Sequence, residues 1–80
     1  MHKNNLPTYA IVELLMRLAQ HNNSIGDYKN HSAFDEGVMV KTSGGTIRFP
    51  MALIMQQFEN PEMVSDNVLL NIASSFKPLK

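Results

Sequence analysis

The sequence contains no cysteine, so neither disulfide bonds nor thiolate metal sites can stabilise it. It also has no excess of charge of either sign, because seven lysine and arginine side chains balance seven aspartate and glutamate side chains. A protein whose main role is to bind nucleic acid usually carries a basic excess, since phosphate neutralisation drives the affinity. The neutral composition therefore argues against that role and leaves only a local basic patch to support it.

Long apolar runs are missing as well. No run approaches the roughly 20 residues that cross a bilayer, and the opening Met-His-Lys-Asn-Asn-Leu-Pro contains no apolar signal core. We therefore expect a cytoplasmic protein without a membrane partner. The length of 80 residues predicts a single small domain (1–80). This length is near the lower limit at which a chain can form a sufficient hydrophobic core on its own. Without disulfides, oligomerisation is the expected source of added stability.

Residues 8–20 have the strongest helical pattern, because apolar side chains recur at i, i+3, i+4 and i+7. Three more apolar residues widen this stripe, and one polar line separates its edges. The stripe consists of Ala10, Ile11, Leu14, Leu15 and Leu18, the widening residues are Val12, Met16 and Ala19, and the polar line is Glu13, Arg17 and Gln20. Glu13 and Arg17 have the favourable order for an ion pair facing water. The helix needs cover on most of its circumference, from this chain or from a second one.

Residues 1–6 are polar and are expected to be frayed. Residues 22–37 have no sustained hydrophobic period and predict a long loop. Loops longer than about 12–15 residues are uncommon in compact domains and are often functional. Ile25, Tyr28 and Phe34 are too apolar for a free linker, so we expect them to pin the loop to the body of the protein.

Residues 38–50 give the clearest local signal, two alternating stretches joined by Gly44 and Gly45, which is typical of a two-residue β-hairpin. The expected register places Lys41 opposite Arg48 on the outward face. The other face gathers Val38, Val40, Thr42, Ile47 and Phe49. Like charges directly opposite each other repel, so the cationic pair either blunts an exposed edge or meets an anionic partner.

Two helical patterns follow the hairpin. The first carries Met51, Leu53, Ile54, Met55 and Phe58 on its apolar face, and the second carries Val64, Val68, Leu69, Ile72, Ala73 and Phe76. Gln57 is expected to face away from the core. Asn60 and Ser65 compete as the cap of the last helix, which should continue to the residues before Pro78. The expected fold is therefore α+β: an N-terminal helix, a long loop, a two-stranded antiparallel β-hairpin and two C-terminal helices.

No catalytic motif stands out. No His-x-x-x-His pair lies on a predicted helix, and no serine lies in a Gly-x-Ser-x-Gly turn. His31 has Asp27, Asp35 and Glu36 near it in sequence, which leaves a small metal-dependent enzyme as one alternative. The expectation is a protein that is not an enzyme and has no cofactor, metal or catalytic residues.

The stretch from Lys41 to Pro50, followed by Leu53, resembles the swapped-hairpin DNA-binding domains of antitoxins and transition-state regulators. Those families carry a Gly-x-Ile-x-Ile-Pro stretch that leads into a short helix. The resemblance implies an intertwined dimer that binds DNA through the hairpin. It is confined to this part of the chain, and Met51-Ala52 stands where those families usually have a charged pair.

The favoured hypothesis is a small regulatory or inhibitory protein of a bacterial or phage system that binds another protein and is a homodimer. The expected partner-binding residues are Tyr28, His31, Phe34, Lys41 and Arg48. The expected dimer or core seam consists of Ile11, Leu14, Leu15, Leu18, Met51, Met55 and Phe58. Nucleic acid is the alternative partner, through a DNA-binding transcriptional regulator or antitoxin-like protein that uses the hairpin at 38–50.

Overall fold

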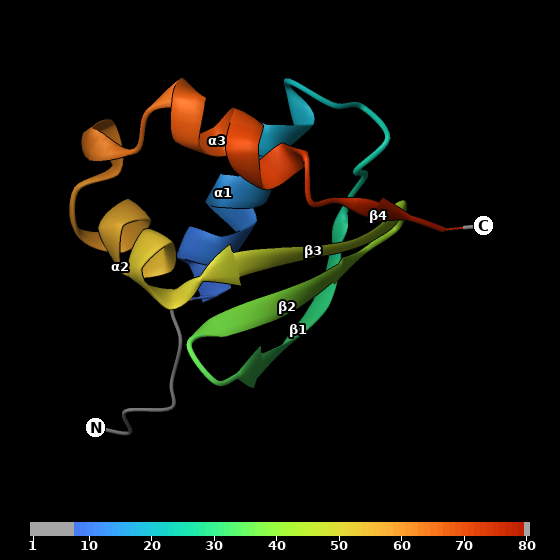
Figure 1. Cartoon of the computed structure of the whole chain (residues 1–80), viewed down its shortest axis with the longest axis horizontal. Helices are drawn as coiled ribbons and strands as arrows, with labels where there is room; N and C mark the ends of the chain where they lie inside the picture. The colour runs from blue at the N-terminus through green and yellow to red at the C-terminus, as the bar shows by residue number, and fades with distance from the viewer. Residues whose placement is uncertain (1–7, 80) are drawn as a thin grey trace.

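The computed structural model describes residues 8–79, and the segment 1–6 that was predicted to be frayed lies outside this range. Its elements in chain order are α1 (Thr8–Ala19), β1 (Tyr28–Phe34), β2 (Gly37–Thr42), β3 (Gly45–Pro50), α2 (Met51–Glu59), the 3-10 helix η1 (Pro61–Met63), α3 (Asp66–Ala73) and β4 (Lys77–Pro78) (Figure 1). The predicted α+β class is confirmed. Between residues 8 and 79, no helix combines the length and the apolarity that crossing a membrane requires.

The sheet has four strands where the sequence predicted two. All pairs are antiparallel, in the order β1-β2-β3-β4. β1 lies inside the predicted loop at 22–37, and β4 adds a two-residue bridge to β3. β1 lacks an alternating pattern because it is an edge strand with mostly exposed residues. The predicted long loop is therefore wrong, and β1 is one of the two edge strands of the sheet.

β2 and β3 form the predicted hairpin with a different register. Lys41 pairs with Thr46 and Arg48 pairs with Met39, so the predicted pairing of Lys41 with Arg48 is wrong. The pairing is offset by two residues, and an even offset leaves every side chain on its expected face. The apolar face of the hairpin is therefore buried as predicted, while the neighbours on the outward face change.

The buried hydroxyl of Thr42 sets this register. Its Oγ1 accepts the backbone N–H groups of Gly44 and Gly45 at 3.1 and 3.0 Å and donates to the carbonyl of Ile25 at 2.5 Å. The Gly44 N–H also donates to the Ile25 carbonyl, at 3.0 Å. A Cβ on Gly44 would lie 1.8 Å from the carbonyl oxygen of Ser24. The hairpin turn is thus fixed by a loop that crosses it, and Gly44 is needed for the close approach of the two backbones.

The helices lie on one side of the sheet (Figure 1), where α2 contacts β2 and β3 and α3 contacts β3. The core consists of Ala10, Ile11, Leu14, Leu15, Leu18, Ile25, Val38, Val40, Ile47, Phe49, Leu53, Ile54, Val64 and Leu69. The apolar stripe of α1 and the apolar face of the hairpin are both in this set, so these two predictions are confirmed.

α2 turns a different face to the core from the one predicted. Leu53, Ile54 and Gln57 are buried, whereas Met55 and Phe58 are exposed. The prediction was wrong for Gln57 because a buried amide is acceptable when both of its polar ends find partners. Those partners come from α1.

Arg17 connects α1 to α2 and to the segment around η1. Its guanidinium donates to Gln57 Oε1 at 2.9 Å and to the backbone carbonyls of Pro61 and Val64 at 3.3 and 2.6 Å. Gln57 Nε2 in turn donates to Glu13 Oε1 at 3.3 Å. The predicted ion pair of Glu13 with Arg17 is replaced by an amide that bridges the two side chains. Glu13 and Arg17 are therefore half-buried against the neighbouring segment, and within the polar line Gln20 is the residue exposed to water.

Ser65 is the cap of α3, since its hydroxyl accepts the N–H of Val68 at 3.3 Å. Asn60 precedes η1 and makes no side-chain cap bond. α3 ends at Ala73, earlier than the expected stop before Pro78, because the chain turns there to place β4 beside β3.

Candidate functional site

The face of the sheet opposite the helices, which we call the open face, is not covered by any other described element. Cross-strand pairing arranges its residues in three rows. The row nearest the β2–β3 turn consists of Asn30, Lys41, Thr46 and Lys77, the next row of Ser32, Met39 and Arg48, and the row beside the β1–β2 turn of Phe34, Gly37 and Pro50. These ten positions include three cations and no anion.

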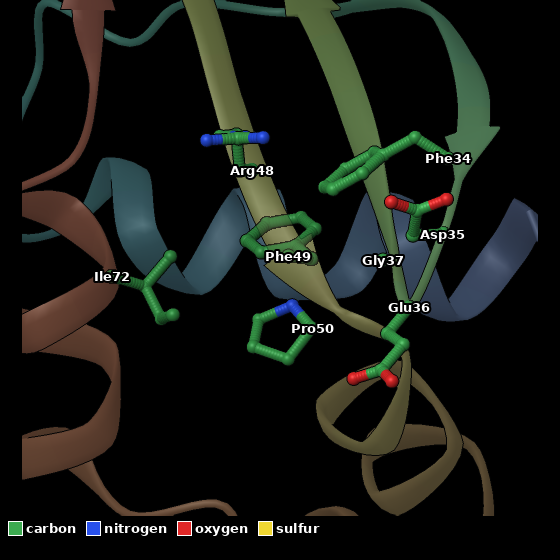
Figure 2. Close-up of a pocket in the computed structure, with 8 residues that line it drawn as sticks. All are labelled: Phe34, Asp35, Glu36, Gly37, Arg48, Phe49, Pro50 and Ile72. Atoms are coloured by element: carbon green, nitrogen blue, oxygen red, sulfur yellow. The ribbon is translucent and has the colours of Figure 1, made fainter.

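Phe34 and Arg48 stack across β2. The guanidinium carbon of Arg48 lies 4.7 Å from the centroid of the Phe34 ring, although β2 separates their strands. The ring can lie over β2 because Gly37 has no side chain: a Cβ there would be 3.0 Å from Phe34 Cζ and 2.7 Å from the carbonyl oxygen of Phe49. Figure 2 shows the ring extended over β2 toward Arg48, with α1 on the far side of the sheet. This cation–π contact holds the cation in place on the open face.

A groove of about 800 Å³ borders this stack. It is lined by Phe34, Asp35, Glu36, Gly37, Arg48, Phe49, Pro50 and Ile72 (Figure 2). Ile72 of α3 lies at one side and the turn at Asp35 and Glu36 lies at the other. Binding clefts for small ligands measure about 300–1,000 Å³. The groove is therefore large enough to hold a few side chains, with a cationic part at Arg48 and an anionic part at the turn.

Three cations surround Thr46, and we call Lys41, Arg48 and Lys77 the basic triangle. Lys41 and Lys77 are the cross-strand neighbours of Thr46 on its two sides, and Arg48 lies two residues along the same strand. Strands are about 4.8 Å apart and alternate residues about 7 Å apart, so the three side chains share a small area. Between residues 8 and 79 none of the three forms an ion pair.

The five predicted partner-binding residues divide between two faces of the sheet. Phe34, Lys41 and Arg48 lie on the open face, and the first and last of these are stacked. Tyr28 and His31 lie on the other face, as the partners of Thr42 and Val40 in the ladder. The Tyr28 hydroxyl is 2.7 Å from His31 Nδ1. The structure thus brings three of the five together.

Sequence reasoning missed Lys77, Thr46 and Met39. Lys77 joins the open face only because β4 pairs with β3, and a two-residue strand that contains proline has no strand pattern. Thr46 and Met39 alternate with the buried residues of the hairpin, so a period of two could have placed them outward. The incorrect register gave them the wrong neighbours.

Within the described part of the chain, no group of three or more His, Asp and Glu side chains is placed to hold a metal ion. His31 bonds to Tyr28, and His21 Nε2 lies 3.7 Å from the carboxylate of Asp66. The first contact lies within β1, and the second connects the end of α1 to the start of α3.

A second exposed surface runs along α1. Tyr9, Val12, Met16 and Ala19 follow a 3-4-3 spacing on its solvent side, where Tyr9 and Met16 are each 63 % exposed. We call these four residues the α1 flank. A groove of about 360 Å³ connects Val12, Met16 and Ala19 to the start of β1 at Tyr28. The flank is therefore apolar and uncharged, and it adjoins the start of the edge strand β1.

The residues of the predicted seam have different positions. Ile11, Leu14, Leu15 and Leu18 belong to the core, Met51 is partly buried against the core, and Met55 and Phe58 are exposed on α2. Of the two roles left open by the sequence, core or dimer contact, the four residues of α1 have the first.

Comparison of this chain with protein-family models, curated proteins and solved structures found no match. The fold and the open face define a small α+β protein with a helix-covered sheet and one bare, basic sheet surface. The likeness to swapped-hairpin domains stays confined to the hairpin, which here lies between β1 and β4 of its own chain.

Proposed function

We propose that the protein is a non-enzymatic regulator or inhibitor that binds another protein on the open face of its sheet. The observation that carries this proposal is the stack of Phe34 and Arg48 beside the groove. Arginine and aromatic residues are enriched among the residues that contribute most binding energy at protein interfaces. An arginine already held against a ring loses less side-chain entropy when it binds.

The composition of the open face supports a partner as well. Antiparallel sheets commonly have one solvated face, so exposure alone carries little weight. Here, however, Phe34, Met39 and Pro50 occupy outward positions among the cations. Aromatic residues, methionine and arginine are enriched at protein interfaces relative to the rest of the surface, and the open face presents one of each in Phe34, Met39 and Arg48.

The first test selects peptides from a random displayed library on the wild-type protein and measures their affinity by fluorescence anisotropy. We expect Phe34→Ala and Arg48→Ala each to weaken binding about 30-fold, because truncating a central interface residue costs about 2 kcal/mol. Phe58→Ala is the matched control, since Phe58 is an exposed aromatic residue of α2 and should leave the affinity unchanged. Peptides that bind all three variants equally would show that the open face is not the binding surface.

The proposal includes a homodimer formed through the α1 flank. A two-fold interface brings the same patch of both copies together, so a patch that carries no charges can pair with its copy without charge repulsion. The 3-4-3 spacing of the flank is that of the seam between paired helices. The edge strand β1 lies next to it, and two such strands can pair in the same two-fold arrangement.

Met16→Glu is expected to convert the dimer to a monomer, because the substitution places two carboxylates at the seam. Met63→Glu is the matched control: Met63 is 65 % exposed on η1, compared with 63 % for Met16, and its variant should remain a dimer. Light scattering gives the mass of each. A wild-type protein that is monomeric at high micromolar concentration, or a Met16 variant that stays dimeric, contradicts the proposal.

DNA binding through the hairpin is the second candidate function, and the basic triangle is the observation that favours it. A two-stranded ribbon can enter the major groove of DNA. This function predicts a salt-sensitive affinity for duplex DNA that is lost when Lys41 and Arg48 are both replaced by glutamine. No binding to duplex DNA at low salt would remove this candidate.

A further inference from the structure

We propose that the basic triangle binds carboxylate groups, so that the partner's binding segment is an extended acidic peptide. This inference rests on the proposed function, because it names the chemistry of a partner that occupies the open face. It adds to that function a role for Lys77, and it predicts where the acidic residues lie in the bound segment.

The charge of the basic triangle is not compensated. Lys41 and Lys77 flank Thr46 in neighbouring strands, and Arg48 lies on the same face. Like charges at this spacing repel each other, and between residues 8 and 79 no carboxylate pairs with any of them. A carboxylate placed over Thr46 removes this repulsion and can accept charge-assisted hydrogen bonds from the ammonium groups and from the guanidinium.

The charge of the surface changes sign along the strands. The triangle lies toward the β2–β3 turn, whereas Asp35 and Glu36 lie at the opposite end, in the β1–β2 turn. A nucleic-acid backbone has the same negative charge along its whole length, so it would meet repulsion at this turn. A peptide can be acidic at one end and neutral or basic at the other.

The open face offers little aromatic surface for stacking. Proteins that bind single-stranded nucleic acid on a sheet offer aromatic rings to successive bases. Phe34 is the one aromatic residue among the ten positions of the open face, and Arg48 covers it. The open face therefore suits a peptide better than it suits bases.

The geometry gives the expected spacing in the peptide. From Lys41 to Gly37 the open face spans four residue steps of β2, which is about 14 Å at 3.4 Å per residue. Alternate side chains of an extended peptide point to the same side. We therefore expect acidic residues at two alternate positions over the triangle, followed two residues later by an apolar residue in the groove beside Pro50 and Ile72.

The experiment uses three fluorescent probes: a peptide with the pattern Asp-x-Asp-x-Leu, the same peptide with asparagine in place of aspartate, and a duplex DNA. Anisotropy is measured with the wild-type protein and with the double variant Lys41→Gln/Lys77→Gln. Both lysines are exposed, so the fold is retained. Lys29→Gln is the matched control, because Lys29 is an exposed cation of β1 that lies outside the triangle.

We expect the acidic peptide to bind at least tenfold more tightly than the neutral one, with an affinity that falls as salt rises. The double variant should lose this preference and the Lys29 variant should keep it. Equal binding of both peptides, still dependent on Phe34, overturns the acidic partner but leaves the proposed function intact. Tighter binding of duplex DNA with the same lysine dependence overturns it in favour of nucleic acid. If neither peptide binds and the displayed library yields none, both proposals fail.

Discussion

Replacing Thr42 with valine is expected to lower the free energy of unfolding by about 2–3 kcal/mol, although valine has nearly the same shape and is more apolar. The Thr42 hydroxyl accepts hydrogen bonds from the backbone N–H groups of Gly44 and Gly45 and donates one to the carbonyl of Ile25. Gly45 is buried, and an N–H group buried without an acceptor costs about 1–3 kcal/mol. A domain of this length has a total stability on the order of 4–12 kcal/mol, so the loss is a large share.

Urea unfolding of Thr42→Val and Thr42→Ser separates the hydroxyl from the methyl group. Serine keeps the hydroxyl and loses one methyl group, which is worth about 0.8 kcal/mol, so the serine variant should be the more stable of the two. A valine variant as stable as the wild type would mean that the Thr42 network does not fix the turn. Loss of amide protection at Gly44 and Gly45 in hydrogen exchange would locate the effect in the turn.

The Thr42 network explains why the sequence predicted the strands of the hairpin but not their register. Alternation is a local property, so the buried face of β2 and β3 could be predicted from the residues themselves. The register depends on Ile25 and Ser24, which approach the turn from a distant part of the chain. No local pattern records this contact, and the two glycines suit either turn.

β1 and β4 were missed for a different reason. A strand signal comes from burial of alternate residues, and β1 is an edge strand that buries little. β4 has two residues, one of which is proline. Both strands exist because β2 and β3 offer edges to pair with, so their positions depend on tertiary structure. The sequence therefore predicted only the part of the open face that β2 and β3 supply.

Three of the predicted partner-binding residues lie together on the open face. Two of them belong to the hairpin, whose strands were predicted correctly. Lys41 and Arg48 alternate with buried residues, which fixes their face. Phe34 joins them through the gap above Gly37, a contact that becomes apparent only when β1 is paired with β2. Tyr28 and His31 lie on the other face as the ladder partners of Thr42 and Val40, which the sequence did not predict because it indicated a loop in place of β1.

The helix α1 was predicted correctly, but the surroundings of its polar and apolar sides were not. Its buried stripe was predicted residue by residue, yet the solvent side is the apolar line that contains Tyr9 and Met16. The polar line with Glu13 and Arg17 is turned toward Gln57 of α2. Polar side chains on a helix usually indicate water, but here they satisfy one another and the backbone of a neighbouring segment.

Replacing Arg17 with methionine is therefore expected to lower the free energy of unfolding by about 3 kcal/mol, because hydrogen bonds from a charged donor are worth about 1.5–3 kcal/mol each. Methionine keeps much of the apolar stem but removes the donors to Gln57 and to the carbonyls of Pro61 and Val64. Lysine should be intermediate, since a single ammonium cannot reproduce the planar fork of a guanidinium.

Arg48→Met is the matched control, because it makes the same chemical change on the exposed face, where the cation–π contact with Phe34 is worth about 0.5–1 kcal/mol. Equilibrium unfolding should rank the Arg17 variant well below the Arg48 variant. Hydrogen exchange should show the loss at the segment from 57 to 66, which joins α2 to α3 through η1, before it shows any loss in the sheet. Equal destabilisation by the two substitutions would mean that the helical layer is held by its apolar contacts alone, and that Arg17 is no more than a surface cation.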